Sequence, residues 1–157
     1  MKMIRSVIAL ALLFIATEAA ARFNPLATVI MLDTNNNQYA WRLKGNESTT
    51  LTVKQVEQAD SIIDVCIAQN KGTKETSSSI GRFIGNHTFM RQIIPSVNKK
   101  GEIIIWANCF AQEHAELVDD WHYEPLIVHD GGMGGGFFNV MINLTTRTYY
   151  DLYVNGI

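Results

Sequence analysis

One segment of the sequence is periodic enough to define its own secondary structure. Between residues 52 and 70, in "TVKQVEQADSIIDVCIAQN", apolar residues recur every three or four positions, which predicts an amphipathic α-helix. Thr52 and Gln55 have the spacing of a capping box, and Gly72 follows as a stop signal. Such a helix is stable only when its apolar side is covered, so the rest of the chain must supply an apolar layer. The predicted apolar stripe consists of Val53, Val56, Ala59, Ile63, Cys66 and Ile67.

The second half of the chain has the shorter, alternating pattern of β-strands. "TFMRQIIPSV" and "EIIIWANCFA" flank "NKKG", which predicts a β-hairpin. Three later segments, "EPLIVHD", "GFFNVMINL" and "TYYDLYVNG", predict further strands. Alternation in the last two predicts one covered face and one face in water. The residues assigned to the covered face are Phe138, Val140 and Ile142 in one strand, and Tyr150, Leu152 and Val154 in the other.

Together these segments predict an α+β fold, in which one amphipathic helix packs on an antiparallel sheet of four to five strands. Nearer the N-terminus, "ATVIML" fits either a strand or a helix, and "QYAWRL" predicts a short strand. We expect one domain, residues 22–157, because about 136 residues suit a single core. A cystatin has similar layering, but this is an analogy of fold alone, and the cystatin Q-x-V-x-G loop is missing.

The first 21 residues have the order of a secretory signal peptide. Lys2 and Arg5 precede an apolar run over residues 7–16, and small residues follow at 19–21. The run is about half the roughly 20 residues needed to cross a bilayer. We therefore expect cleavage near Ala21, a secreted or periplasmic product, and no transmembrane anchor.

The charge of the chain argues against several classes of partner. The net charge is -2, and loss of Lys2, Arg5 and Glu18 with the signal peptide would make it about -3. Without a basic block, the sequence does not favour binding to nucleic acid or to an anionic membrane. Three N-x-[ST] triplets would be glycosylated only in a eukaryotic secretory route; they begin at Asn46, Asn86 and Asn143.

Two cysteines in an exported chain raise the question of a disulfide. Cys66 falls on the predicted helix stripe, and Cys109 lies on a strand face shared with Ile105 and Ala107. If the helix covers that face, the two sulfur atoms could meet. The sequence leaves a Cys66–Cys109 disulfide and two buried free thiols as open alternatives.

The glycine-rich stretch "HDGGMGGGFF", residues 129–138, does not match a phosphate-binding loop. A Walker loop requires a following Lys-Ser/Thr, a Rossmann turn must open a helix, and here a strand pattern follows. We interpret the stretch as a connection between two strands, where glycine permits unusual backbone angles. The alternative is a loop that lets a ligand approach the backbone closely, at Gly134 and Gly135.

No catalytic residue is predicted, and no cofactor is expected. The segment 113–130 holds His114, His122 and His129 among carboxylates, which suit zinc or calcium. However, it contains neither H-E-x-x-H nor an EF-hand loop, so a metal site is only an alternative. Cys109 lacks the flanking motif of a cysteine hydrolase, and no G-x-S-x-G elbow is present.

Aromatic residues are concentrated in the C-terminal half of the chain. Alternation should expose some of them on the sheet face away from the helix, where they would form a contact surface. We expect Trp106, Tyr149 and Tyr153, with Gly134 and Gly135 of the loop, to contribute to it. The alternative is that N-terminal strands or an oligomeric partner cover these side chains.

Two stretches, "RQIIPSVNKKGEIIIWANCF" and "VHDGGMGGGFFNVMINLTTRTYYDLYVNG", carry a resemblance to small secreted proteins of unknown function from Bacteroidetes. The similarity covers about residues 87–157. It implies a Gram-negative envelope or extracellular setting, but no activity, cofactor or catalytic residue. "GGMGGG" is longer here than the loop expected for that group.

The leading functional hypothesis is a secreted or periplasmic, non-enzymatic module that binds a protein, a peptide or a glycan. One alternative is a metal-binding protein or metal-dependent enzyme that uses the segment 113–130. Another is a structural envelope subunit whose sheet edge pairs with a second chain. The oligomeric state is left open by the sequence.

Overall fold

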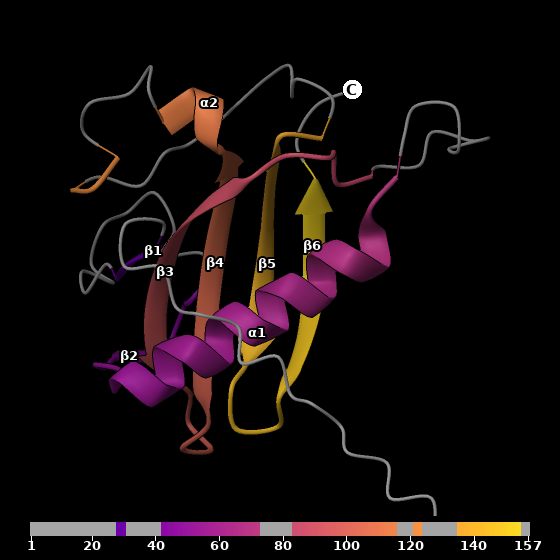
Figure 1. Cartoon of the computed structure of the whole chain (residues 1–157). Coiled ribbons are helices and arrows are strands. Elements are labelled where there is room, and N and C mark those ends of the chain that lie inside the picture. The colour runs from indigo at the N-terminus through magenta and orange to yellow at the C-terminus, as the bar shows by residue number, and fades with distance from the viewer. Residues whose placement is uncertain (1–27, 31–41, 73–82, 116–120, 124–134, 155–157) are drawn as a thin grey trace, which may run out of the picture.

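The computed structural model describes residues 28–30, 42–72, 83–115, 121–123 and 135–154. Within them, six strands form one sheet and a long helix crosses one of its faces (Figure 1). This confirms the predicted α+β fold. The elements are β1 Thr28–Ile30, β2 Glu47–Ser48, α1 Val53–Asn70, β3 Phe89–Val97, β4 Ile103–Ala111, α2 Gln112–Ala115, β5 Phe137–Asn143 and β6 Thr148–Val154.

The sheet is built around an antiparallel meander. Strands β3, β4, β5 and β6 lie side by side in chain order, each antiparallel to the next. The predicted hairpin at "NKKG" is confirmed as the connection between β3 and β4, and Gly101 takes a φ of +77° there. On the outer side of β3, β2 pairs antiparallel and β1 pairs parallel. The ambiguous run "ATVIML" thus contains a strand.

Helix α1 begins as the sequence predicts. The Gln55 amide donates to Thr52 Oγ1 at 3.3 Å, and the Thr52 amide donates to Gln55 Oε1 at 2.8 Å, which completes the capping box. The helix ends at Asn70, two residues before Gly72. Most of the predicted stripe is buried, but Val53 in the first turn is 66% exposed, so its assignment to the stripe is wrong.

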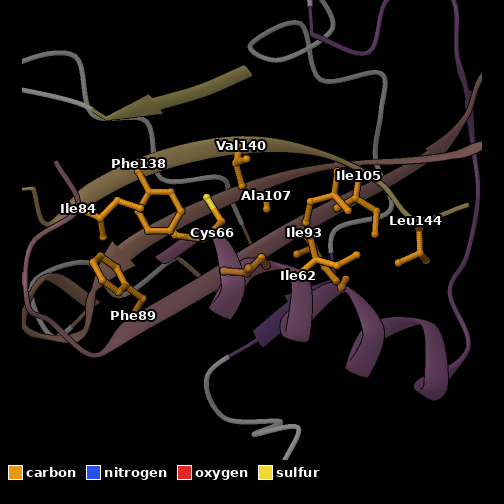
Figure 2. Close-up of a cluster of buried hydrophobic side chains, with 14 of the residues drawn as sticks. Ile62, Cys66, Ile84, Phe89, Ile93, Ile105, Ala107, Phe138, Val140 and Leu144 are labelled. Carbon is orange, nitrogen blue, oxygen red and sulfur yellow. The ribbon is translucent and has the colours of Figure 1, made fainter. Parts of the chain in front are cut away.

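The main core lies between α1 and the sheet. Figure 2 shows Ile62 and Cys66 of the helix among side chains of β3, β4 and β5. Full burial of one such aliphatic side chain contributes about 1.5–3 kcal/mol. The buried members of this helix–sheet cluster are Val56, Ala59, Ile62, Ile63, Cys66, Ile84, Phe89, Ile93, Ile105, Ala107, Cys109, Phe138, Val140, Ile142, Leu144 and Val154.

A buried ion pair joins the helix to the sheet beside this cluster. Arg91 Nη1 of β3 lies 2.9 Å from Asp60 Oδ1 of α1, and Arg91 Nη2 contacts Asp64. Thr28 Oγ1 of β1 donates to Asp60 Oδ1 at 3.2 Å. Burial raises the pKa of Asp60, and the charge of Arg91 opposes that shift. The pair lets a carboxylate occupy the buried side of α1, where the sequence pattern predicts only apolar residues.

The alternation in β5 predicted that the sheet face away from α1 lies in water. In the structure this face is buried at β5. Phe138, Val140 and Ile142 face the helix as expected, but Asn139 and Met141 between them are also buried. Leu43, which lies outside the strands, belongs to the same buried cluster as Met141. The prediction of one wet face is therefore wrong for β5, because other parts of the chain cover its second face.

A β-bulge changes the order of side chains along β6. The pairing of β5 with β6 shifts between Asn139 and Met141, and Asp151 has a φ of +49°. Tyr149, Leu152 and Val154 consequently pack against the helix–sheet cluster, while Tyr150 is 41% exposed. The prediction that Tyr150 shares a covered face with Leu152 and Val154 is wrong, since the extra residue reverses the alternation.

Some predicted segments lie outside the described residues. These are the signal peptide at 1–21, the strand "EPLIVHD" at 124–130, and residues 38–41 of "QYAWRL". The last two residues of "QYAWRL", Arg42 and Leu43, do not lie in a strand. No helix in the described part of the chain is long and apolar enough to span a membrane.

Candidate binding surface

Three amide side chains form a row across the middle of the sheet. Gln92 of β3 is in register with Asn108 of β4, and Asn108 with Asn139 of β5. Cross-strand partners point to the same face of a sheet, and their neighbours Ile93, Ala107 and Phe138 pack on the α1 side. Gln92, Asn108 and Asn139, here called the amide row, therefore lie on the face away from the helix. Each is at most 8% exposed.

Two hydrogen bonds among the described residues link the amide row in the direction of β3. Asn108 Nδ2 donates to Gln92 Oε1 at 2.9 Å, and Gln92 Nε2 donates to the carbonyl oxygen of Trp121 at 2.5 Å. Asn139 ends the row on the β6 side. Its Oδ1 atom is buried, and none of the described residues donates a hydrogen bond to it. Buried polar atoms are usually paired, so this oxygen requires an explanation.

Apolar clusters border the amide row along the strands. On the side towards the β3–β4 hairpin, Trp106 belongs to a cluster with Leu43 and Met141. Beyond the other side, the rings of Phe110 and Trp121 meet edge to face, with centroids 5.4 Å apart. The apolar clusters on both sides lower the local dielectric constant around the amide row, which strengthens hydrogen bonds made there and increases the cost of unmade ones.

At the β6 side, the row meets an exposed border of polar and aromatic side chains. Tyr153 is directly opposite Asn139 and is 42% exposed; Tyr150 is opposite Met141 and is 41% exposed. Burial raises the pKa of Tyr150, and the neighbouring charge of Asp151 adds to the shift. Burial lowers the pKa of Arg42, whereas Asp151 and Tyr153 act in the opposite direction. Tyr150, Asp151 and Tyr153 of β6, together with Arg42, which interacts electrostatically with Asp151 and Tyr153, are called the tyrosine border.

The predicted aromatic contact residues are separated by the fold. Trp106 is only 5% exposed and belongs to an apolar cluster. Tyr149 lies on the opposite face, where its hydroxyl accepts from Asn70 Nδ2 at 3.2 Å and donates to Gln69 Oε1 at 2.6 Å. Only Tyr153 of the three is strongly exposed. Tyr150 and the amide row carried no sequence signal, because the bulge and the strand register are not visible in the sequence.

Gly135, in the glycine stretch, packs against another part of the chain. Gly135 has a φ of +78°, and its carbonyl accepts from the Gly85 amide at 3.0 Å. A Cβ atom here would collide with the Phe83 carbonyl oxygen and would lie 2.5 Å from the Gly85 nitrogen. Glycine at this position therefore permits close approach by the chain's own backbone. Gly134 and the preceding part of the loop lie outside the described residues.

The histidines of the candidate metal site have other surroundings. His114 is buried and stacks on Phe137, with ring centroids 4.6 Å apart. His122 is exposed, and the centroid of its ring lies 3.8 Å from the centroid of the Trp121 ring. His129 is outside the described residues. Among the residues that are described, no three His, Cys, Asp or Glu side chains form a group that could hold a metal ion.

Both cysteines are free thiols buried in the helix–sheet cluster. Burial raises the pKa of the Cys66 thiol to about 11. Burial also raises the pKa of Cys109, and the charge of Arg91 offsets only part of that shift. Because the thiolate is the reactive form, neither sulfur is suited to act as a nucleophile in this environment.

We expect the two thiols to be protected by folding. Ellman's reagent at pH 8 should react with neither cysteine in the native protein and with both after denaturation in guanidinium chloride without reductant. The reason is that burial keeps Cys66 and Cys109 protonated and inaccessible. No reaction in the denaturant would instead show that the two cysteines form a disulfide.

The described surface offers contacts rather than an evident reaction centre. It combines a buried acceptor at Asn139 with exposed phenol rings at Tyr150 and Tyr153. Comparison of the chain with protein-family models, with curated proteins and with solved structures finds no match. Its function therefore has to be inferred from these contacts.

Proposed function

We propose that the protein is an exported, non-enzymatic binding module whose ligand contacts the tyrosine border. The observation that carries this proposal is the exposure of Tyr150 and Tyr153 on one side of β6. Tyrosine gives a large contact area for a small loss of side-chain entropy, and it is enriched at binding surfaces. Arg42 and Asp151 add charges of both signs beside the rings. The signal-peptide pattern of residues 1–21 supports export.

Side-chain contact is favoured over the addition of a strand to the sheet. In the described residues, β6 is a terminal strand of the sheet and pairs only with β5. An added strand needs a continuous series of backbone donors and acceptors. The bulge at Asp151 interrupts that series, as bulges on edge strands commonly do. This disfavours the alternative of a structural subunit joined through its sheet edge.

The proposal is tested by removing the two exposed phenol rings. Two ligand sources serve as probes: a phage library of random linear peptides, and a panel of neutral hexasaccharides. We expect the double variant Tyr150→Ala/Tyr153→Ala to bind the best ligand found at least tenfold more weakly than the wild type, because buried tyrosine contacts dominate such interfaces. Affinity is measured by isothermal titration calorimetry.

Tyr123→Ala is the matched control. Tyr123 is 82% exposed, and it follows the Trp121–Gln92 contact at the β3 side of the sheet. This variant should bind like the wild type, and circular dichroism should show that all variants fold. Equal affinity of the wild type and the double variant for every ligand found would contradict the proposal.

A further inference from the structure

The amide row points to the kind of ligand that the tyrosine border binds. Gln92 and Asn108 make hydrogen bonds within the described structure, whereas Asn139 Oδ1 receives none from it. Asn139 is also the member next to Tyr153. An unsatisfied buried acceptor has lost its hydrogen bonds to water without gaining another, which destabilises the folded state. The unpaired Oδ1 atom lies at the end of the amide row nearest the exposed tyrosine rings. Such a buried acceptor is expected where a ligand supplies the missing hydrogen-bond donor.

We propose that Asn139, Tyr150 and Tyr153 form a saccharide subsite, in which a sugar hydroxyl donates a hydrogen bond to Asn139 Oδ1. This inference rests on the proposed function and names its ligand class. Sugar rings combine apolar C–H faces, which pack on aromatic rings, with hydroxyl groups that donate hydrogen bonds to acceptors such as an amide oxygen. Tyr150 and Tyr153 offer the rings, and Asn139 offers the acceptor.

The position of Asn139 favours a saccharide over a peptide main chain. A peptide added as a strand would lie outside β6, whereas Asn139 belongs to β5, one strand further in. A ligand that reaches its Oδ1 atom must therefore lie on the face of the sheet. Tyr153 is opposite Asn139 on that face and is 42% exposed, so the inferred path of the hydroxyl to Oδ1 requires a rotation of the Tyr153 ring. The mild net charge and the lack of a basic block favour a neutral sugar over a polyanion.

Removing the acceptor should weaken binding without weakening the fold. In Asn139→Leu, the unpaired Oδ1 acceptor is replaced by an apolar side chain of similar size, which removes the cost of burying that unpaired atom. We expect the melting temperature of this variant to equal or exceed that of the wild type. A role of Asn139 in stability alone would predict a lower melting temperature, so this measurement separates the two explanations.

The direct test is an NMR titration of the wild-type protein. The probes are cellohexaose, laminarihexaose, xylohexaose, mannohexaose and chitohexaose. With at least one of them, we expect saturable shifts of the Asn139 side-chain amide resonances and of the Tyr150 and Tyr153 backbone resonances. Asn139→Leu should lower the affinity for that sugar about tenfold, the effect of losing one hydrogen bond. Gln58→Leu, an amide substitution on α1, should leave the affinity unchanged.

The outcomes distinguish this inference from the proposed function. If random peptides bind through Tyr150 and Tyr153 but no hexasaccharide shifts the Asn139 resonances, the saccharide subsite is wrong and the binding module stands. If neither peptides nor sugars depend on the two tyrosines, both proposals are wrong. Sugar binding that is unchanged in Asn139→Leu would also overturn the subsite. If Asn139→Leu does not fold, the titration of the wild type tests the subsite: saturable shifts of the Asn139 side-chain amide support it, and their absence contradicts it.

Discussion

Replacing Arg91 by methionine should destabilise the protein by about 3–5 kcal/mol, because it leaves a buried charge without its partner. Arg91 Nη1 lies 2.9 Å from Asp60 Oδ1, and the Asp60 side chain is only 5% exposed. Without the guanidinium, the partner that Asp60 keeps among the described residues is Thr28 Oγ1, 3.2 and 3.4 Å from its two carboxylate oxygens. Urea denaturation at pH 7 measures the loss. A change below about 1 kcal/mol would show that the pair contributes little.

A double variant and a change of pH test the same explanation. Asp60→Leu/Arg91→Met removes both charges and should recover most of the stability lost in the single variant. Burial already raises the pKa of Asp60 above 3.8, and loss of Arg91 should raise it further. A raised carboxyl pKa favours the folded state at low pH, and that contribution is lost as the pH rises through the folded value. The deficit of Arg91→Met should therefore be largest at pH 7 and smaller near pH 4.

Substituting Gly135 by alanine should destabilise the protein by about 2–4 kcal/mol. Two costs combine here. The φ of +78° is unfavourable for a residue with a side chain, and the new Cβ would meet the backbone at Phe83 and Gly85. Backbone atoms cannot rotate away as a side chain can, so the segment 83–85 must shift. Thermal and urea denaturation both measure the effect.

Gly101→Ala separates the two costs. Gly101 has nearly the same φ, +77°, but no atom lies within 4 Å of the position of an added Cβ. This variant should lose only about 1 kcal/mol, the cost of the left-handed backbone. If Gly135→Ala and Gly101→Ala lowered the free energy of unfolding by equal amounts, the close contact with the segment 83–85 would not contribute to the effect.

The predictions that succeeded depend on signals contained within a few neighbouring residues. Thr52 and Gln55 cap α1 through bonds between residues three apart, and "NKKG" joins two strands that are adjacent in the chain. Such signals do not require knowledge of the rest of the fold. The burial of Phe138, Val140 and Ile142 against α1 also followed directly from their alternation.

The site could not be predicted in the same way. Trp106 was expected at an exposed contact surface, yet it is buried in a cluster that includes Leu43, more than 60 positions away in the chain. The amide row exists only because three strands align Gln92, Asn108 and Asn139 in one register. No local pattern specifies such an alignment, since register depends on the packing of the whole sheet.

The sequence by itself determined the helix, the hairpin and the α+β class of this protein, because periodicity and turn chemistry act over short distances along the chain. Only the tertiary structure decided which aromatic residues remain exposed. The bulge at Asp151 places Tyr150 and Tyr153 on the same face of the sheet, where they are exposed at β6, whereas long-range packing buries that face at β4 and β5. The physical reason is that exposure depends on contacts between distant segments, which alternation along one strand does not encode.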